Sequence, residues 1–418
     1  MTRLLEPRSW WRHAPMLAAL WIQTGCASAQ DFTDFAPTPP MGWNSWDCYG
    51  SSVNEAEVRA NADYMAANLA EFGWEYIVVD IRWYVANPND HSYTGNPIYV
   101  LDGNGRILPA PNRFPSADGG NGVNLGFKPL ADYVHGLGLK FGVHMMRGIN
   151  QKAWTDDLPI ADSPYTTRDI LRNRWDNGQI DNGATWLHDS YGMEQTPEAQ
   201  AYYDSLFDLY AEWGVDYVKV DDMLRDFAHP NDSYYADEIE MIRQAIDQTG
   251  RPMVLSLSPG DAPLVHAAHT QAHANMWRIT DDLWDNWGHI YTMFQRADEW
   301  TPYRASGTWP DNDMLPLGRI GIRAHNGGDR MSNLTPNEQQ TLMSLWHISR
   351  SPLMFGGDLP SNDGFTLSLL NNPELIAVNQ HSSNNRQLFR TSDLVAWAAD
   401  APNGGTYVAV FNLNDTSD

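Results

Sequence analysis

Short apolar runs alternate along this chain with longer segments of helical periodicity, and this alternation limits the possible folds more than any other feature. Residues 76–80 read Tyr-Ile-Val-Val-Asp, a run rich in β-branched side chains that ends on a carboxylate. Before it, apolar residues recur at helical spacing from Glu55 to Phe72, after an Asn54/Glu57 pair typical of a capping box. Strands that alternate with helices indicate βα units and a parallel sheet.

The same alternation predicts eight strands. They are expected at residues 41–46, 76–80, 139–145, 215–221, 253–258, 276–280, 308–314 and 352–356. Helical patterns separate them; for example, Thr196-Pro197 is typical of a helix start, and Gly214 follows the last apolar position at Trp213. Eight parallel strands with intervening helices predict a (β/α)8 barrel, in which functional residues lie at the C-terminal ends of the strands.

Polar or aromatic side chains stand at or just beyond nearly every one of these expected strand ends. They are Trp46, Asp80, His144, Asp221, Ser258, Asp282 and Asp313. Any one Asp or Ser at such a position is also explained as a helix cap. Their recurrence around one face of a barrel favours a functional site.

Two acidic doublets, Asp221-Asp222 and Asp281-Asp282, carry the chemical signal. Lys219 lies on the same strand face as Asp221, and a nearby ammonium group keeps a carboxylate ionised, as a nucleophile requires. Paired carboxyl groups about 5–5.5 Å apart suit retaining glycoside hydrolysis, and about 6.5–9.5 Å suits inversion. The same pair also fits a magnesium or calcium site. Zinc is disfavoured, because the histidines show no HExxH-like spacing.

Composition excludes several classes of protein. The 418 residues carry 27 Lys and Arg against 52 Asp and Glu, a net charge of −25, which argues against nucleic acid or an anionic membrane as partner. Two cysteines are too few for a disulfide scaffold. The apolar runs are shorter than the roughly 18 residues that a membrane span needs.

The first residues have the pattern of a signal peptide. Arg3, Arg8 and Arg12 precede the apolar stretch 14–22, and Ala27-Ser28-Ala29 matches a cleavage signal. An amphipathic N-terminal helix is the alternative. Lipid attachment at Cys26 is disfavoured by Gln23. We therefore expect residues 1–29 to be removed and the protein to be secreted or periplasmic.

Three further parts of the chain complete the expected organisation. The long connections 84–127 and 147–196 leave strands at the presumed active face, so we expect them to wall the pocket. After the barrel, expected at 30–385, residues 394–399 and 406–413 form a hairpin pattern. We interpret residues 386–418 as the start of a small antiparallel β domain, and we expect that domain to be truncated.

Several motifs in order resemble the α-galactosidases of glycoside hydrolase family 27. The motifs are MGWNSW at 41–46, YVKVD at 217–221, WRITDDL at 277–283, WPDNDML at 309–315, SPLM at 351–354 and NPELIAVNQ at 372–380. The resemblance runs from about Pro39 to Asn379. It implies a (β/α)8 barrel followed by an antiparallel β domain.

Position by position, the resemblance implies roles for named residues. Asp221 matches the nucleophile and Asp282 the acid/base of a double displacement that needs no metal or cofactor. Contacts with a carbohydrate substrate are expected from Trp46, Asp80, His144, Lys219, Ser258, Arg278, Asp313 and Met314. Structural alternatives remain for some of them: Lys219 as a partner of Asp222, or Arg278 as a bridge to Asp281 or Asp282.

Three positions depart from the usual α-galactosidase pattern. Ile81 stands where a second aspartate follows Asp80, His144 where a tyrosine is common, and Ser258 where a Glu–Trp pair is common. Losing a hydrogen-bonding carboxylate changes sugar preference strongly.

The activity expected first is that of an exo-acting α-galactosidase. The alternatives are a β-L-arabinopyranosidase, whose sugar is galactose without its C6 arm, an isomaltose-releasing dextranase, and a carbohydrate-binding barrel without catalysis.

Overall fold

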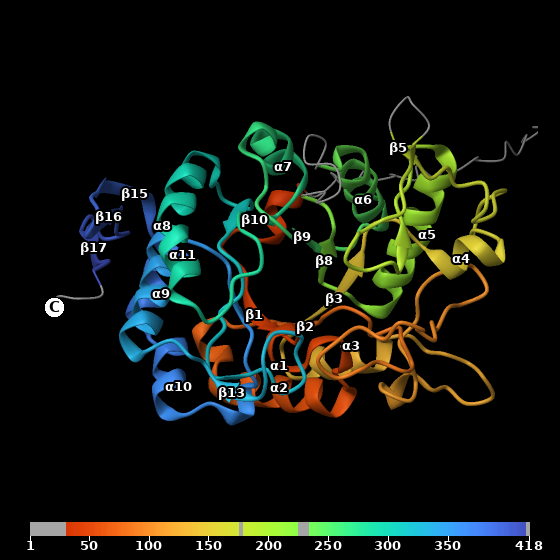
Figure 1. Ribbon diagram of the computed structural model, residues 1–418, viewed down its shortest axis with the longest axis horizontal. Helices are drawn as coiled ribbons and strands as arrows, with labels where there is room; N and C mark the ends of the chain where they lie inside the picture. Colours follow the sequence, from red (N-terminus) through yellow and green to blue (C-terminus); the bar gives the residue numbers. More distant parts are fainter. Residues whose placement is uncertain (1–30, 175–178, 225–233, 415–418) are drawn as a thin grey trace, which may run out of the picture.

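The computed structural model describes residues 31–174, 179–224 and 234–414. Its centre is a parallel sheet of eight strands in the order β11-β10-β9-β8-β3-β2-β1-β14 (Figure 1). These strands are β1 (Met41–Asn44), β2 (Tyr76–Val79), β3 (Lys140–Met146), β8 (Tyr217–Asp221), β9 (Val254–Leu257), β10 (Met276–Arg278), β11 (Trp309–Asp311) and β14 (Leu353–Phe355). All eight expected strands are present, each slightly shorter or shifted.

The two ends of this sheet are linked just beyond β11. Leu315 forms a parallel bridge with Phe355 of β14. Its backbone N–H donates to the Met354 carbonyl at 2.8 Å, and its carbonyl accepts from Gly356 at 3.0 Å. This contact closes the sheet on itself, so the expected (β/α)8 barrel is confirmed.

Helices surround the sheet (Figure 1). They are α1 (Trp46–Tyr49), α2 (Glu55–Asn68), α3 (Lys128–Gly136), α4 (Gln151–Asp156), α5 (Pro197–Trp213), α6 (Ala236–Thr249), α7 (Ala267–His273), α8 (Trp287–Trp300), α9 (Pro336–Ser349), α10 (Gly364–Leu370) and α11 (Pro373–His381). The expected capping box of Asn54 and Glu57 starts α2. Thr196 caps α5, and Gly214 ends it in a left-handed conformation.

A three-stranded antiparallel sheet follows the barrel. It consists of β15 (Ser383–Arg390), β16 (Leu394–Asp400) and β17 (Thr406–Asn412). The expected hairpin corresponds to β16 and β17, and β15 adds a strand that the sequence pattern did not reveal. Phe411 of β17 packs edge-on against Phe294 of α8, with ring centroids 4.9 Å apart. The small sheet therefore shares its apolar core with the barrel.

Short antiparallel pairs brace the loops: β4 (Ile149–Asn150) with β7 (Ser190–Tyr191), β5 (Asn173–Arg174) with β6 (Gln179–Ile180), and β12 (Arg319–Ile320) with β13 (Arg330–Met331).

The expected signal peptide, residues 1–29, lies outside the described residues, so export stays a prediction. Among the described helices, none combines the length and apolar character needed to cross a membrane.

Candidate active site

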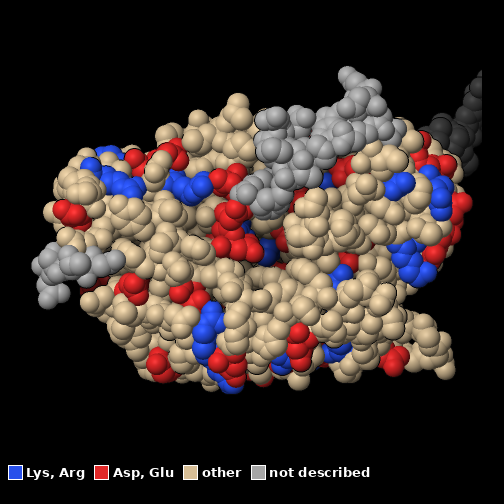
Figure 2. Space-filling model, in the orientation of Figure 1, with Lys and Arg blue, Asp and Glu red and all other residues tan. Residues whose placement is uncertain are grey.

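A cavity of about 510 Å³ opens at the C-terminal ends of the barrel strands. Figure 2 shows acidic side chains gathered at the edge of a hollow near the middle of this face. Tyr93 from the long connection 84–127 lines the cavity, as do Thr185 and Trp186 from the connection 147–196. The expectation that these two connections wall the pocket is confirmed.

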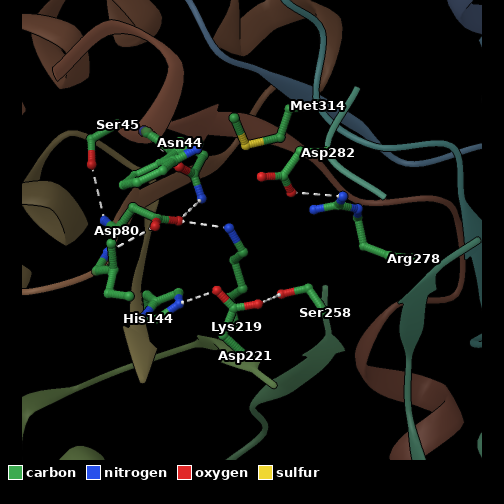
Figure 3. A network of polar contacts seen from close by, with 12 residues as sticks. Asn44, Ser45, Asp80, His144, Lys219, Asp221, Ser258, Arg278, Asp282 and Met314 are labelled. Atoms are coloured by element: carbon green, nitrogen blue, oxygen red, sulfur yellow. Dashed lines mark hydrogen bonds and ion pairs between the residues drawn. The ribbon is translucent and has the colours of Figure 1, made fainter. Parts of the chain in front are cut away.

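Asp221 ends β8 and faces the cavity between two hydrogen-bond donors (Figure 3). His144 Nε2 lies 3.0 Å from its Oδ2, and Ser258 Oγ donates to its Oδ1 at 2.7 Å. Burial by itself raises the pKa of Asp221. The hydrogen bond and charge of His144, the charge of Lys219 and the hydrogen bond from Ser258 outweigh burial and hold this pKa well below its usual value. The carboxylate is therefore ionised over the pH range in which a nucleophile must work.

His144 and Ser258 lie behind Asp221 rather than on the cavity wall. Both are 0% exposed, and neither lines the cavity. The expectation that they contact substrate needs correction, because His144 Nε2 and Ser258 Oγ are both hydrogen-bonded to the Asp221 carboxylate. The structure gives them a positioning role.

Lys219 and Asp80 form an ion pair that lines the cavity. Lys219 Nζ donates to Asp80 Oδ2 at 2.9 Å, and Asn44 Nδ2 donates to the same oxygen at 2.8 Å. Burial raises the pKa of Asp80, but the Lys219 charge reverses the shift, and the net change is downward. Lys219 thus pairs with Asp80, and the suggested pairing with Asp222 is wrong.

Asp222 lies where the chain turns, and it contacts Arg147. Its φ of 65° is left-handed, and its carboxylate accepts from Arg147 Nε at 2.9 Å. Of the doublet Asp221-Asp222, Asp221 therefore lines the cavity, and Asp222 belongs to a buried ion-pair network around Arg147. Arg147 also pairs with Glu238 at 2.7 Å.

Asp282 follows β10 and lies across the cavity from Asp221 (Figure 3). Arg278 holds its carboxylate in place. Arg278 Nη2 donates to Asp282 Oδ1 at 3.0 Å and also lies 3.0 Å from Asp313 Oδ2. The Asp282 side chain is 55% exposed, against 13% for Asp221. Asp221 is thus fixed and buried, whereas Asp282 is open to water. Met314 lines the same wall.

Ile81 lines the cavity directly after Asp80. Its side chain packs in an apolar group with Met146 and Leu187, against Trp46. The position that holds a second aspartate in the usual α-galactosidase pattern is therefore an apolar surface here.

Several wall residues were not found from the sequence. Tyr93 stacks near Trp46, with centroids 6.2 Å apart, and His325 lies 4.9 Å from Trp46 and 4.3 Å from Tyr93. Burial, with the charge of Arg82, lowers the pKa of His325 to about 4, so its ring is neutral near neutral pH. These rings come from separate loops, and no spacing along the chain connects them.

Asp47 is a further carboxyl group on the wall that the sequence pattern did not reveal. It is buried, and its Oδ2 accepts no hydrogen bond from the described residues. Burial, together with the negative charges of Asp313 and Asp282, raises its pKa well above the usual value. A neutral acid group is the expected form of Asp47.

Comparison with known proteins identifies the family. A family model described as alpha galactosidase A matches residues 190–381. The α-galactosidase A of Cellvibrio japonicus is 30% identical over 85% of this chain and 70% of its own length. The chain belongs to glycoside hydrolase family 27. As a family 27 member it is a glycosidase, and its barrel followed by an antiparallel sheet is the fold of that family.

Two solved structures are more similar in sequence to this chain than the α-galactosidase A of Cellvibrio japonicus is. A family 27 β-L-arabinopyranosidase from Geobacillus stearothermophilus is 51% identical, with a TM-score of 0.87, over 93% of this chain and 87% of that one. A putative α-N-acetylgalactosaminidase from Bacillus halodurans is 49% identical, with a TM-score of 0.77, over 90% and 84%. This family 27 glycosidase is therefore similar to proteins described with different terminal sugars.

Proposed function

We propose that this glycosidase removes terminal β-L-arabinopyranose by a retaining double displacement. The observation that carries the choice of sugar is Ile81, an apolar residue on the cavity wall at the position of the second aspartate in the usual α-galactosidase pattern. A hydroxymethyl arm finds no carboxylate acceptor there, whereas a pentopyranose has no such arm. The 51% identity to a family 27 β-L-arabinopyranosidase supports the same choice.

The reaction uses the two carboxyl groups in turn. An Asp221 oxygen attacks the anomeric carbon while Asp282 gives its proton to the leaving oxygen, and the glycosidic bond breaks. Asp282 then takes a proton from water, whose oxygen attacks the same carbon and releases Asp221 as a carboxylate. Two displacements leave the anomeric configuration as it was. The open position of Asp282 suits its exchange of protons with leaving group and water.

The sugar is gripped by the polar groups beside these carboxylates. Asp80 accepts hydrogen bonds from sugar hydroxyls, and Lys219 donates to them while remaining paired with Asp80 at 2.9 Å. Arg278 and Asp313, whose Nη2 and Oδ2 atoms lie 3.0 Å apart, supply a second pair of polar groups that line the cavity. Trp46 offers an apolar face to the ring.

α-Galactosidase activity, the first expectation, is the second candidate. It is favoured by the family model and by curated α-galactosidases that are 28–30% identical. Both activities use one mechanism on sugars that differ only in the C6 arm. A comparison of the two substrates on one enzyme therefore separates them.

The substitution Ile81→Asp tests the assignment of the sugar. We expect the wild type to prefer an aryl β-L-arabinopyranoside over an aryl α-galactoside, and Ile81→Asp to shift the ratio of kcat/KM toward the galactoside by about tenfold or more. The reason is that a carboxylate supplies the missing acceptor for the C6 hydroxyl. Steady-state kinetics on both glycosides measures the ratio.

Ile81→Leu is the matched control, since it keeps an apolar wall and should leave the ratio within about threefold. Residual cleavage of the arabinopyranoside shows that Ile81→Asp folds. A wild type that prefers the galactoside would contradict the choice of sugar, while loss of both activities in Asp221→Ala would still support the mechanism.

The positioning role of His144 predicts a pH effect. Burial raises the pKa of Asp221, and His144 is one of the groups that lower it. In His144→Phe this lowering effect is lost, so the pKa of Asp221 rises from well below its usual value. Because Asp221 must be ionised to attack, activity is lost first at low pH. We expect the acid limb of kcat/KM to move upward by at least about one pH unit.

The measurement is kcat/KM between about pH 3 and pH 8. Ser258→Ala removes only one neutral donor and should shift the same limb in the same direction by less. An unchanged limb in a folded His144→Phe enzyme would show that His144 does not control the charge of Asp221.

A further inference from the structure

A group of side chains that could bind a metal ion lies on the outside of the barrel, where α6 contacts α7 (Figure 1). Glu240 belongs to α6, and His269 and His273 belong to α7. One ligand atom from each of the three side chains lies within 4.8 Å of the other two. None of the three residues lines the sugar cavity. The group is therefore separate from the proposed catalytic machinery.

The two histidines face the same direction because they are four residues apart on one helix. Their rings are stacked, with centroids 4.2 Å apart and an angle of 28° between the planes. Glu240 Oε1 lies 3.1 Å from His269 Nε2. Two imidazole nitrogens and one carboxylate oxygen thus converge from two helices.

Each histidine has a hydrogen-bond partner at Nδ1, so Nε2 is the ring nitrogen left to bind an ion. His273 Nδ1 lies 2.7 Å from the His269 carbonyl oxygen, which only accepts, so Nδ1 carries the hydrogen. Thr270 Oγ1 donates to the His266 carbonyl at 3.1 Å and so accepts from the Tyr234 hydroxyl at 2.8 Å. The Tyr234 oxygen then accepts from His269 Nδ1 at 2.7 Å.

This chain of donors leaves the Nε2 lone pair of both histidines unprotonated when the rings are neutral. A lone pair on His269 Nε2 at 3.1 Å from a carboxylate oxygen is repulsive unless a proton or a cation lies between them. Metal-binding histidines characteristically have the other nitrogen held by a carbonyl or a similar acceptor. His269 and His273 share this feature, because the Nδ1 of each lies beside an oxygen that accepts its hydrogen.

We propose that Glu240, His269 and His273 bind one transition-metal ion of the zinc type, with water as a fourth ligand. Imidazole nitrogen favours Zn²⁺ and its neighbours over Ca²⁺ or Mg²⁺, which prefer oxygen. The ion joins α6 to α7, the helices that follow β8 and β9. Its role is structural, because its ligands lie outside the sugar cavity, and it takes no part in glycoside cleavage.

The experiment is a calorimetric titration of chelator-treated full-length protein with Zn²⁺, alongside thermal unfolding with and without the ion. We expect one equivalent to bind and the unfolding temperature to rise, since an ion that binds only the folded state stabilises it. Ca²⁺ at the same concentration should do neither. His273→Gln should weaken Zn²⁺ binding more than about tenfold, and Tyr234→Phe, which removes the hydroxyl that contacts His269 Nδ1 and Thr270 Oγ1, about tenfold.

His381→Gln is the matched control, because this histidine is exposed on α11, away from the cluster. The variants should unfold like the wild type when no Zn²⁺ is present, which separates lost binding from lost folding. Glycoside cleavage should be unchanged in all of them. Unchanged Zn²⁺ affinity in both His273→Gln and Tyr234→Phe, or an equal loss in His381→Gln, would overturn the proposal.

Discussion

Replacing Asp221 with alanine is expected to lower kcat by about 10⁴-fold or more on every glycoside that the wild type cleaves. The loss is large because Asp221 is the carboxylate that His144 and Ser258 both hold among the described residues, and without it no covalent intermediate forms. Steady-state kinetics with an aryl β-L-arabinopyranoside measures the effect.

The matched variant is Asp221→Asn, which keeps the shape of the side chain and one of its two acceptor oxygens but cannot attack. It should be as inactive as the alanine variant while unfolding near the wild-type temperature. Turnover by either variant at more than about one hundredth of the wild-type rate would exclude Asp221 as the nucleophile.

Asp282→Ala is expected to give the second largest loss, and its size should depend on the leaving group. An unactivated disaccharide needs protonation of the departing oxygen, so its cleavage should fall by about 10²–10⁴-fold. A dinitrophenyl glycoside leaves without a proton, so formation of its glycosyl-enzyme should change far less. Comparing kcat/KM on the two substrates measures the difference.

Asp281→Asn is the control for this prediction, because Asp281 precedes Asp282 in the chain and lines the same cavity. It should leave the ratio between the two substrates unchanged. An Asp282→Ala enzyme that cleaves the disaccharide at the normal rate would contradict the role of Asp282.

The fold could be predicted from local patterns because its elements carry strong local signals. Residues 76–80 combine β-branched side chains with a terminal aspartate, and Asn54 with Glu57 caps α2 as expected. Asp80, Asp221 and Asp282 could be placed at one mouth because parallel strands in a barrel point their C-terminal ends to one face. Strand β15 was missed, since its residues, SNNRQLFR, lack an apolar alternation.

Other features depend on contacts between distant segments. His325 reaches the cavity because its loop is held to the long connection 84–127. The His91 backbone N–H donates to the Arg323 carbonyl at 3.0 Å, and His91 Nδ1 lies 2.8 Å from the Ala324 carbonyl. The partner of Lys219 proved to be Asp80, two strands away in the sheet, rather than the nearby Asp222. No spacing along the chain encodes either contact.

The placement of His144 and Ser258 shows a related limit. Strand position put both at the active face, but it could not separate a group on the cavity wall from one behind the carboxylate. That distinction depends on which atom each side chain touches, and both contact Asp221.

The configuration of the glycosyl azide formed by the Asp221→Ala and Asp282→Ala enzymes tests the division of roles most directly. With azide and a dinitrophenyl glycoside, Asp221→Ala should let azide attack from the side of the missing carboxylate and give the inverted azide. In Asp282→Ala, azide should intercept the glycosyl-enzyme on Asp221 and give the azide with the configuration of the substrate. Proton NMR of the two products distinguishes them. Retained product from Asp221→Ala, or inverted product from Asp282→Ala, would contradict the assignment of attack to Asp221 and protonation to Asp282.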